Sequence, residues 1–407
     1  MEGFFTKKET QSISRPDGKI HSCYACGLYK DCESPRMKPY GNFKKKILNI
    51  GEAPGEMEDR NGKPWQGKAG RLLRRTYKSL GIDLFDDCLN INACSCRPTD
   101  KGGNNRSPSN FEVGCCRKAV LRIVDEYKPK VIILLGNIAL FSLIGHRWKK
   151  DLGGITKWRG WSVPDQDFGC WVCPTFHPSF IERSDINSVE EVIWSQDLEQ
   201  ALSYWEHHPF PKHVEPEIEI IEDLTILNKI KSAEIAFDYE TTGLKPHAPG
   251  HRIVCVSVAD TKDHAYAFMM PGVRNERLPF INLLTNSRIG KIAQNMKFEH
   301  TWSKVRLKTE VKMWMWDTML ASHVFDNRAG ITNLKFQAYV NFGIVDYASE
   351  IAPYLKATDN KDGNALNRIN ELLAIPGGKE KLLKYCGLDS IYEYRLAKQQ
   401  ESDQLPF

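Results

Sequence analysis

Four short apolar runs in the first half of the chain each lead into a loop rich in glycine, asparagine or histidine. The runs cover residues 47–50, 88–91, 131–135 and 170–176. Continuous apolar runs of this length are typical of strands that are buried on both faces of a parallel sheet. The pattern therefore predicts an open α/β sheet. Ligands of such sheets bind at the carboxyl ends of the strands, so we expect the four loops to meet there.

The loop after the first run is the densest of the four. It reads GEAPGEMEDRNGKPWQGKAG over residues 51–70. Its glycines and proline allow the backbone to approach a ligand closely, and its acidic residues supply carboxylates. An acidic, solvated loop is the alternative. Trp65, placed in a loop and not on a core face, favours a binding loop instead.

Charge is unevenly distributed along the chain. Residues 1–150 hold 28 Lys and Arg against 16 Asp and Glu, an excess of 12, whereas the whole chain carries only +5. A basic region of this kind favours nucleic acid as a partner, although net charge also serves solubility. The first residues lack an apolar signal region, and no apolar run is long enough to span a membrane. We therefore expect a cytoplasmic protein that binds DNA and no membrane.

Cysteines are concentrated in the same region, because ten of the twelve precede residue 174. Without a signal peptide, a disulfide framework is not expected. The pair Cys23 and Cys26, with further cysteines downstream, indicates a soft-metal site. Spacing leaves both tetrahedral zinc and an iron–sulfur cluster open.

The length of 407 residues predicts two or three domains. One clear break lies at residues 203–218, where Pro and His replace any periodic pattern. We expect a first domain over residues 1–205, a linker over 206–224 and a second domain over 225–407. No internal repeat is evident.

The motifs of the first domain together resemble the family-four uracil-DNA glycosylases. They are GEAPG with GKPWQGKAG, then NACSCRP from residue 92, LGN from residue 135 and TFHPS from residue 175. The resemblance covers about residues 20–200. It implies a three-layer α/β/α glycosylase domain with a [4Fe–4S] cluster. The cysteines that match the cluster ligands are Cys23, Cys26, Cys96 and Cys116, and Cys115 could compete with Cys116.

The resemblance also implies roles in a flipped-base pocket. Trp65 would stack on uracil, where the family usually has Phe. Asn92 would face O4 and N3–H, and His177 would donate to O2 as negative charge develops. Further substrate contacts are expected from Gly51, Ala53, Gly55 and Ser179.

Ala53 stands where glycosylases of the first family carry the Asp that positions water. Glu52 or Glu58 would orient the water, or stabilisation of the leaving group would dominate. Gly55 leaves open how thymine is excluded. The alternative function is a catalytically weak, glycosylase-derived DNA-binding clamp or processivity module that tethers the rest of the chain to a polymerase.

The second domain opens with a strand-like run that contains Asp238 and Glu240, followed by two further strand-like runs. This predicts an antiparallel meander. Residues two apart on a strand share one face, so two carboxylates would lie side by side. A hard divalent cation would relieve their repulsion. A solvated strand face is the alternative.

Residues 225–400 resemble the proofreading 3′-to-5′ exonuclease domain of DNA polymerase I, of the ribonuclease H-like DnaQ superfamily. The motifs are DYE from residue 238, QNMKFE from residue 294 and YCGLD from residue 385. The resemblance implies a mixed sheet and two Mg²⁺ or Mn²⁺ ions that activate water. The implied metal ligands are Asp238, Glu240, Glu299 and Asp389, with Tyr385 orienting water and Asn295 and Phe298 holding the substrate end.

Two features of this second resemblance bear on function. Glu299 replaces the usual Asp, so its carboxylate is displaced by about one bond length. The chain stops at Phe407 without polymerase motifs. We therefore expect a bifunctional repair and replication protein, of bacteriophage type, that proofreads for a separate polymerase chain. A metal-free interaction domain is the alternative for this half.

Overall fold

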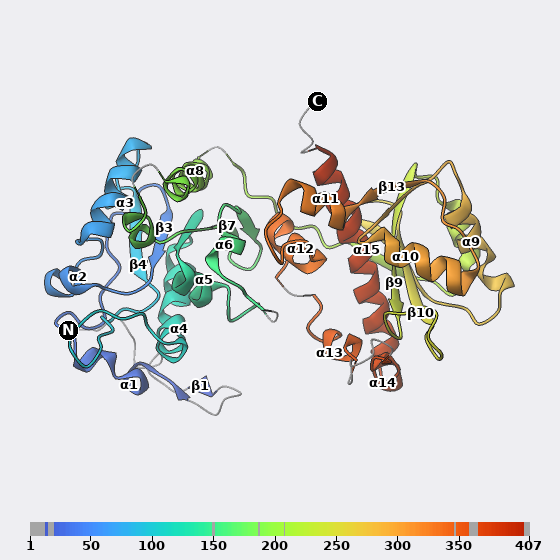
Figure 1. Cartoon of the computed structure of the whole chain (residues 1–407), viewed down its shortest axis with the longest axis horizontal. Coiled ribbons are helices and arrows are strands. Elements are labelled where there is room, and N and C mark those ends of the chain that lie inside the picture. The colour runs from blue at the N-terminus through green and yellow to red at the C-terminus, as the bar shows by residue number, and fades with distance from the viewer. Residues whose placement is uncertain are drawn as a thin grey trace. The chain divides into compact units, whose positions relative to one another are not determined.

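The computed structural model describes residues 13–14, 20–148, 151–185, 188–206, 208–345, 347–357 and 365–402. The chain divides into two compact units, coloured from blue to green and from yellow to red in Figure 1. The first unit comprises Met1–Lys212 and Val340–Gly343, and the second comprises His213–Tyr339 and Ile344–Phe407. Within the described ranges, no helix combines the length and apolar character that crossing a membrane requires.

The first unit is built on a five-stranded sheet in the order β4-β3-β5-β7-β6. Its strands are β3 (Ile47–Gly51), β4 (Cys88–Asn92), β5 (Val131–Leu135), β6 (Val163–Asp165) and β7 (Cys170–Thr175), and a separate pair is formed by β1 (Ile13–Ser14) and β2 (Ile20–His21). β3, β4, β5 and β7 are parallel, whereas β6 is an antiparallel edge strand. The four apolar runs therefore form the parallel sheet that the sequence predicts.

Helices cover both faces of this sheet. They are α1 (Cys23–Cys26), η1 (Leu28–Lys30), α2 (Glu56–Asn61), α3 (Lys68–Ser79), α4 (Asn110–Tyr127), α5 (Asn137–Leu143), α6 (Ile155–Trp158), α7 (Pro178–Glu182) and α8 (Val189–Ser203). α3 and α8 pack Tyr77 and Trp194 against Ile47 and Val131 on one face. α5 packs against β3 and β5, and α4 packs against α5. The result is the predicted three-layer α/β/α unit.

The second unit contains a six-stranded mixed sheet in the order β13-β12-β9-β10-β11-β8. Its strands are β8 (Glu217–Ile220), β9 (Glu234–Thr241), β10 (Ile253–Ala259), β11 (His264–Met269), β12 (Gly290–Ala293) and β13 (Trp314–Asp317). β9, β10 and β11 form the predicted antiparallel meander. β8, β12 and β13 pair in parallel with their neighbours.

One long helix dominates the helical layer of this unit (Figure 1). The helices are η2 (Leu224–Lys229), η3 (Asn275–Arg277), α9 (Leu278–Thr285), α10 (Met296–Trp302), the π-helical η4 (Ser303–Leu307), α11 (Thr318–Phe325), α12 (Leu334–Phe342), α13 (Ala352–Leu355), α14 (Ile369–Ala374) and α15 (Gly378–Ser402). α15 contacts β8 to β12, and it also reaches β13, because the Trp316 Nε1–H donates to Gln400 over 2.8 Å. α9 and η2 pack on a core that includes Phe237 and Tyr239 of β9. Asp238 and Glu240 alternate with these two residues and so point toward α15.

The segment expected as a linker, residues 206–224, differs from that expectation. Residues 217–220 within it form β8, which pairs with β11 of the second unit. Three of the four β8 residues are exposed, so the strand shows no buried apolar face in its sequence. Backbone pairing at a sheet edge creates this strand, and side-chain patterning does not reveal it.

Candidate active sites

A pocket of about 430 Å³ opens where β3, β4 and β7 end. The residues that line it include Glu52, Ala53, Gly55, Glu58, Trp65, Asn92, His177 and Ser179. These come from three segments that lie more than 25 residues apart in the chain. The structure thus brings together every predicted base-site residue except Gly51, which does not line the pocket but lies against Asn92 and Trp65.

Gly51 and Gly136 provide the space that this arrangement needs. A Cβ on Gly51 would lie 2.5 Å from the Asn92 side-chain oxygen and 2.9 Å from the Trp65 ring. A Cβ on Gly136 would lie 2.9 Å from Cβ of His177, and the φ of +91° at Gly136 itself favours glycine. Both glycines therefore keep clear the positions that Asn92, Trp65 and His177 occupy.

Trp65 is anchored from below by a chain of buried polar groups. Its Nε1 donates to Oδ1 of Asn90 over 3.1 Å. Asn49 donates to the same oxygen over 3.0 Å, and the Tyr77 hydroxyl donates to Asn49 over 2.7 Å. Asn49 and Asn90 are fully buried. Each is an amide in the middle of an apolar strand. This break in the apolar pattern is the sequence signal from which both residues could have been found.

His177 is held as a neutral imidazole with a defined tautomer. Burial lowers the pKa of its side chain to about 4. The backbone N–H of Ser179 donates to Nδ1 over 3.2 Å, and the Ser179 hydroxyl lies 2.7 Å from the same nitrogen. Because Nδ1 accepts, the proton resides on Nε2. The ring lies 5.8 Å from the Trp65 ring, between centroids.

The two glutamates predicted to orient the water, Glu52 and Glu58, differ in how they are held. Oε1 of Glu58 accepts the backbone N–H groups of Gln66 and Gly67 over 2.7 and 2.9 Å, so Glu58 fixes the loop that presents Trp65. A Cβ on Gly55 would lie 2.8 Å from Oε2 of Glu58. Glu52 lines the pocket next to Ala53, where no carboxylate is available.

Seven cysteines of the first unit lie close to one another. Cys23 and Cys26 form the ends of α1, whereas Cys115 and Cys116 lie on α4, which contacts α1. Burial raises the pKa of Cys23 to about 11, and Cys26 and Cys116 are among the charges that act on it. Three thiol pairs lie close enough to shift each other's pKa: Cys26 with Cys115, Cys32 with Cys96, and Cys94 with Cys116.

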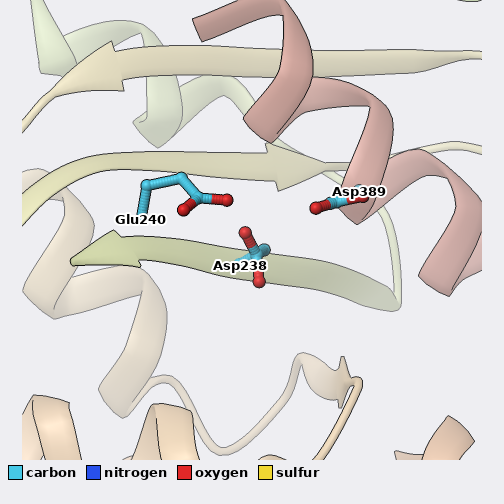
Figure 2. A group of neighbouring side chains, drawn as sticks. All are labelled: Asp238, Glu240 and Asp389. Carbon is cyan, nitrogen blue, oxygen red and sulfur yellow. The ribbon is translucent and has the colours of Figure 1, made fainter. Parts of the chain in front are cut away.

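Three carboxylates of the second unit converge, as Figure 2 shows. Asp238 and Glu240 come from β9 and Asp389 from α15, and their ligand oxygens all lie within 4.8 Å of one another. Burial and the nearby charge of Asp389 raise the pKa of Asp238 to about 7. Burial also raises the pKa of Glu240 well above its usual range. Like charges so close are relieved by a divalent cation, and oxygen donors suit Mg²⁺ or Mn²⁺.

Sequence analysis did not identify two side chains that contact Asp389. Lys335 forms an ion pair with its Oδ1, and the Tyr347 hydroxyl donates to the same oxygen over 2.6 Å. The Lys335 ammonium also lies 4.5 Å from the ring centroids of Tyr347 and Tyr385. Burial and the nearby charge of Asp389 keep the pKa of the Tyr385 hydroxyl well above the usual range. Lys335 and Tyr347 lie outside every motif, so no local pattern pointed to them.

Two buried glutamates adjoin this centre without joining it. Glu299 of α10 and Glu393 of α15 are 2% and 1% exposed, and Oε2 of each lacks a hydrogen-bond partner among the described residues. Burial raises the pKa of both carboxyls, and the charge of Asp238 contributes. The group of three carboxylates does not include Glu299, although the sequence predicts it as a metal ligand. Glu393 was missed because it belongs to no motif.

The remaining predicted residues lie beside the carboxylates. Asn295 adopts a left-handed conformation with φ of 69°, and its backbone N–H donates to Asp317 over 3.1 Å at the start of α10. Phe298 lines a pocket of about 460 Å³ together with Glu240 and Leu244. Glu240 thus belongs both to this pocket and to the group of three carboxylates.

Comparison with known families assigns each unit to a domain family. The model of the uracil DNA glycosylase superfamily matches residues 38–199, and a 3′-5′ exonuclease model matches residues 216–402. Among solved structures, Brucella melitensis NrnC with bound Mg²⁺ is similar with a TM-score of 0.31 and 19% identity, over 46% of this chain and 78% of that chain.

Two relatives extend these matches. The DNA polymerase of Bacillus phage SP01 is 23% identical over 342 residues, which cover 75% of this chain but only 35% of that polymerase. The type-4 uracil-DNA glycosylase of Thermotoga maritima is 32% identical over 200 residues, which cover 49% of this chain and 97% of that protein. Through its first unit the chain therefore belongs to the type-4 uracil-DNA glycosylases, and it is an enzyme that joins a 3′-5′ exonuclease domain to that glycosylase.

Proposed function

We propose that the first unit excises uracil from DNA and that the second hydrolyses DNA from its 3′ end. One observation carries the first activity: Trp65, Asn92 and His177, from separate segments, line one pocket. A protein that only clamps DNA has no need of this set. The three converging carboxylates carry the second activity.

In the glycosylase step, the flipped uracil would stack on Trp65. The Asn92 amide offers a donor and an acceptor to O4 and N3–H, which cytosine cannot match. The Nε2–H of neutral His177 would donate to O2 as the glycosidic bond breaks and charge develops there. Glu58 is engaged with the loop backbone. Of the two glutamates we therefore assign to Glu52 the orientation of the attacking water.

The cysteine arrangement fits a [4Fe–4S] cluster held by Cys23, Cys26, Cys96 and Cys116. Thiolates are the ligands that such clusters take, and these four side chains act on one another electrostatically. The cluster would tie α1 to α4 and to the segment that follows β4. Its contribution would then be to fix the first unit, and no step of base excision passes through it.

In the nuclease step, Asp238, Glu240 and Asp389 would hold divalent cations, and Glu299 would reach the second ion through water. When bound, two such ions activate a water and stabilise the leaving oxygen. Tyr385, which stays protonated, would orient the attacking water. Asn295 fixes the start of α10, and Phe298 would contact the terminal nucleotide in the adjoining pocket.

A uracil-containing oligonucleotide, labelled at its 5′ end, tests both activities with and without EDTA. We expect abasic product in EDTA, and shortening from the 3′ end only with Mg²⁺ or Mn²⁺. His177→Ala should remove the first activity alone and Asp238→Ala the second alone, so each variant is the control for the other. If neither activity appears with either metal, the protein is a DNA clamp.

We further propose that the chain proofreads in the cytoplasm, in a host cell if the protein is viral, for a polymerase. The similarity to a phage DNA polymerase over 75% of this chain supports a replicative role. Size-exclusion chromatography with the replicative polymerase of the same genome, on primed DNA, tests this. Separate elution of the two proteins would instead indicate a free-standing repair nuclease.

A further inference from the structure

Helix α3 carries a row of basic side chains that the base pocket does not use. Arg71, Arg74, Arg75 and Lys78 lie on one side of the helix, whereas Leu73 and Tyr77 on the other side are fully buried. The four basic residues line a hollow of about 410 Å³, here called the α3 groove. The other residues that line the groove are Ile82, Asp83, Leu84 and Phe85.

These cations lack acidic partners in the described part of the chain, and this sets them apart from nearby basic residues. Lys44 pairs with Asp86 and Lys45 with Asp87 on the same unit. The one carboxylate of the α3 groove, Asp83, is engaged by the backbone, because its Oδ1 accepts the N–H groups of Phe85 and Asp86 over 2.9 and 2.8 Å. The groove therefore holds Arg71, Arg74, Arg75 and Lys78 against the single carboxylate of Asp83, and no ion pair among the described residues engages these four cations.

An aromatic floor fixes the geometry of the groove. The Arg74 guanidinium lies 5.8 Å from the centroid of the Phe85 ring, and Phe85 packs edge-on against Tyr40 at 5.2 Å. A guanidinium held in this way is available for two parallel hydrogen bonds to a phosphate group. The combination of unpaired cations and a fixed aromatic surface is suited to a phosphodiester chain.

The position of α3 connects this groove to the base pocket. Gly67 and Lys68, at the start of α3, line the pocket. The helix has 12 residues, so it extends about 18 Å from there. Residues 82–85, the loop residues that line the groove, precede β4. They therefore lie at the amino-terminal ends of the strands, on the edge of the sheet opposite the base pocket.

We propose that the α3 groove is a second DNA-binding site, which holds the phosphate backbone of the DNA that flanks the flipped base. This inference rests on the proposed glycosylase function in one respect: a uracil bound in the base pocket would determine which part of the DNA lies in the groove. The groove begins at Arg71, next to Gly70 of the base pocket. Arg75 and Lys78, however, lie about 10 and 15 Å along α3 from Lys68, beyond the reach of a nucleotide in the pocket. The site therefore acts only on DNA that extends beyond the pocket, and it contributes affinity without base recognition.

The test compares two triple variants with the same loss of charge. Arg71→Gln, Arg75→Gln and Lys78→Gln remove the exposed cations of the groove and keep Arg74 on Phe85, and Gln preserves helix propensity. The matched control replaces Lys44, Lys45 and Lys128 by Gln, lysines that pair with acidic residues. Circular dichroism confirms that both variants fold.

Binding to a uracil-free duplex of about 25 base pairs is measured in EDTA by fluorescence anisotropy at several salt concentrations. We expect the groove variant to bind about tenfold more weakly, with a log–log salt dependence shallower by about two to three, since each lost phosphate contact removes about 0.9 from the slope. The control should keep the affinity and slope of the wild type. Equal affinity and slope for the groove variant and the wild type would overturn the proposal and favour an acidic protein partner.

Excision separates this proposal from the proposed function. With a single-stranded substrate of about three nucleotides and a central uracil, a variant with only Arg75→Gln and Lys78→Gln should act at the wild-type rate, because these two residues lie about 10 and 15 Å along α3 from Lys68 at the pocket. If the wild type itself excises no uracil, the proposed glycosylase function fails, while the binding result still decides the role of the groove. If the variant loses excision on the short substrate as well, the groove residues act on the pocket and the proposal is wrong.

Discussion

At the scale of single residues, the base pocket depends on space that only glycine leaves. In Gly51→Ala, the new Cβ would meet the Asn92 amide and the Trp65 ring. We expect excision to fall by at least about tenfold, which corresponds to about 1.4 kcal/mol of transition-state stabilisation. Gly272→Ala is the matched control, because nothing lies within 4 Å of a Cβ there. Single-turnover excision and thermal unfolding of both variants are measured, and an unchanged rate in Gly51→Ala contradicts the pocket described above.

The protonation of His177 gives a prediction about pH. Its folded pKa of about 4 lies below the usual 6.5, so the imidazole stays neutral and its Nε2–H is available across the neutral range. Single-turnover excision should therefore show no inflection near pH 6.5. Protonation favours the unfolded state, so the stability of the first unit should fall as pH drops from about 6.5 toward 4. A rate that titrates with a midpoint near 6.5 would show that His177 changes charge during the reaction.

Lys335 gives a prediction for the nuclease centre. Its ammonium group pairs with Asp389, so it repels a divalent cation at the same carboxylates. Lys335→Met should therefore strengthen Mn²⁺ binding, by about tenfold if the repulsion is about 1.4 kcal/mol. Isothermal titration calorimetry measures this, with Lys384→Met on α15 as the control, since Lys384 pairs with Glu380 on the surface. Weaker Mn²⁺ binding in Lys335→Met would mean that Lys335 positions the ligands.

At the scale of elements, α4 decides which cysteine faces the cluster. Consecutive helical residues point about 100° apart, so Cys115 and Cys116 cannot both take one ligand position. Cys116 acts electrostatically on both Cys23 and Cys96, whereas Cys115 is the neighbour with the largest effect on the pKa of Cys26. We expect Cys116→Ser to lose most of its bound iron and Cys115→Ser to keep it. Iron analysis and visible absorbance measure this, and the reverse result would assign Cys115 instead.

The elements also show what the sequence could reveal. The strands of the first unit were predictable because buried parallel strands are continuously apolar, and their loops met at one edge as the topology requires. Motif residues such as Asp238 and Asp389 could be found because each lies in a recognisable local pattern. β8 was missed, since an exposed edge strand has no buried face. Lys335 and Glu393 were missed because tertiary packing alone brings them to the carboxylates.

At the scale of the whole molecule, we expect the two compact units to unfold independently of each other. Calorimetry should resolve two unfolding transitions, since each unit has its own core. Mn²⁺ should raise only the transition of the second unit, because a ligand stabilises the state that binds it. At about 100 times the dissociation constant, the gain is about 2.7 kcal/mol. Asp238→Asn should abolish the shift, and a single transition that moves with Mn²⁺ would show that the units unfold together.

The chain of amides beneath Trp65 also constrains how this pocket could have evolved. Asn90 already accepts from Asn49, so a phenylalanine at position 65 would leave no buried group unsatisfied. An indole above an apolar residue at position 90, by contrast, would bury its N–H without an acceptor. In evolution, asparagine at position 90 is therefore expected to precede tryptophan at position 65. Among homologous sequences, tryptophan at this position should be found only where the neighbouring strand already supplies an acceptor.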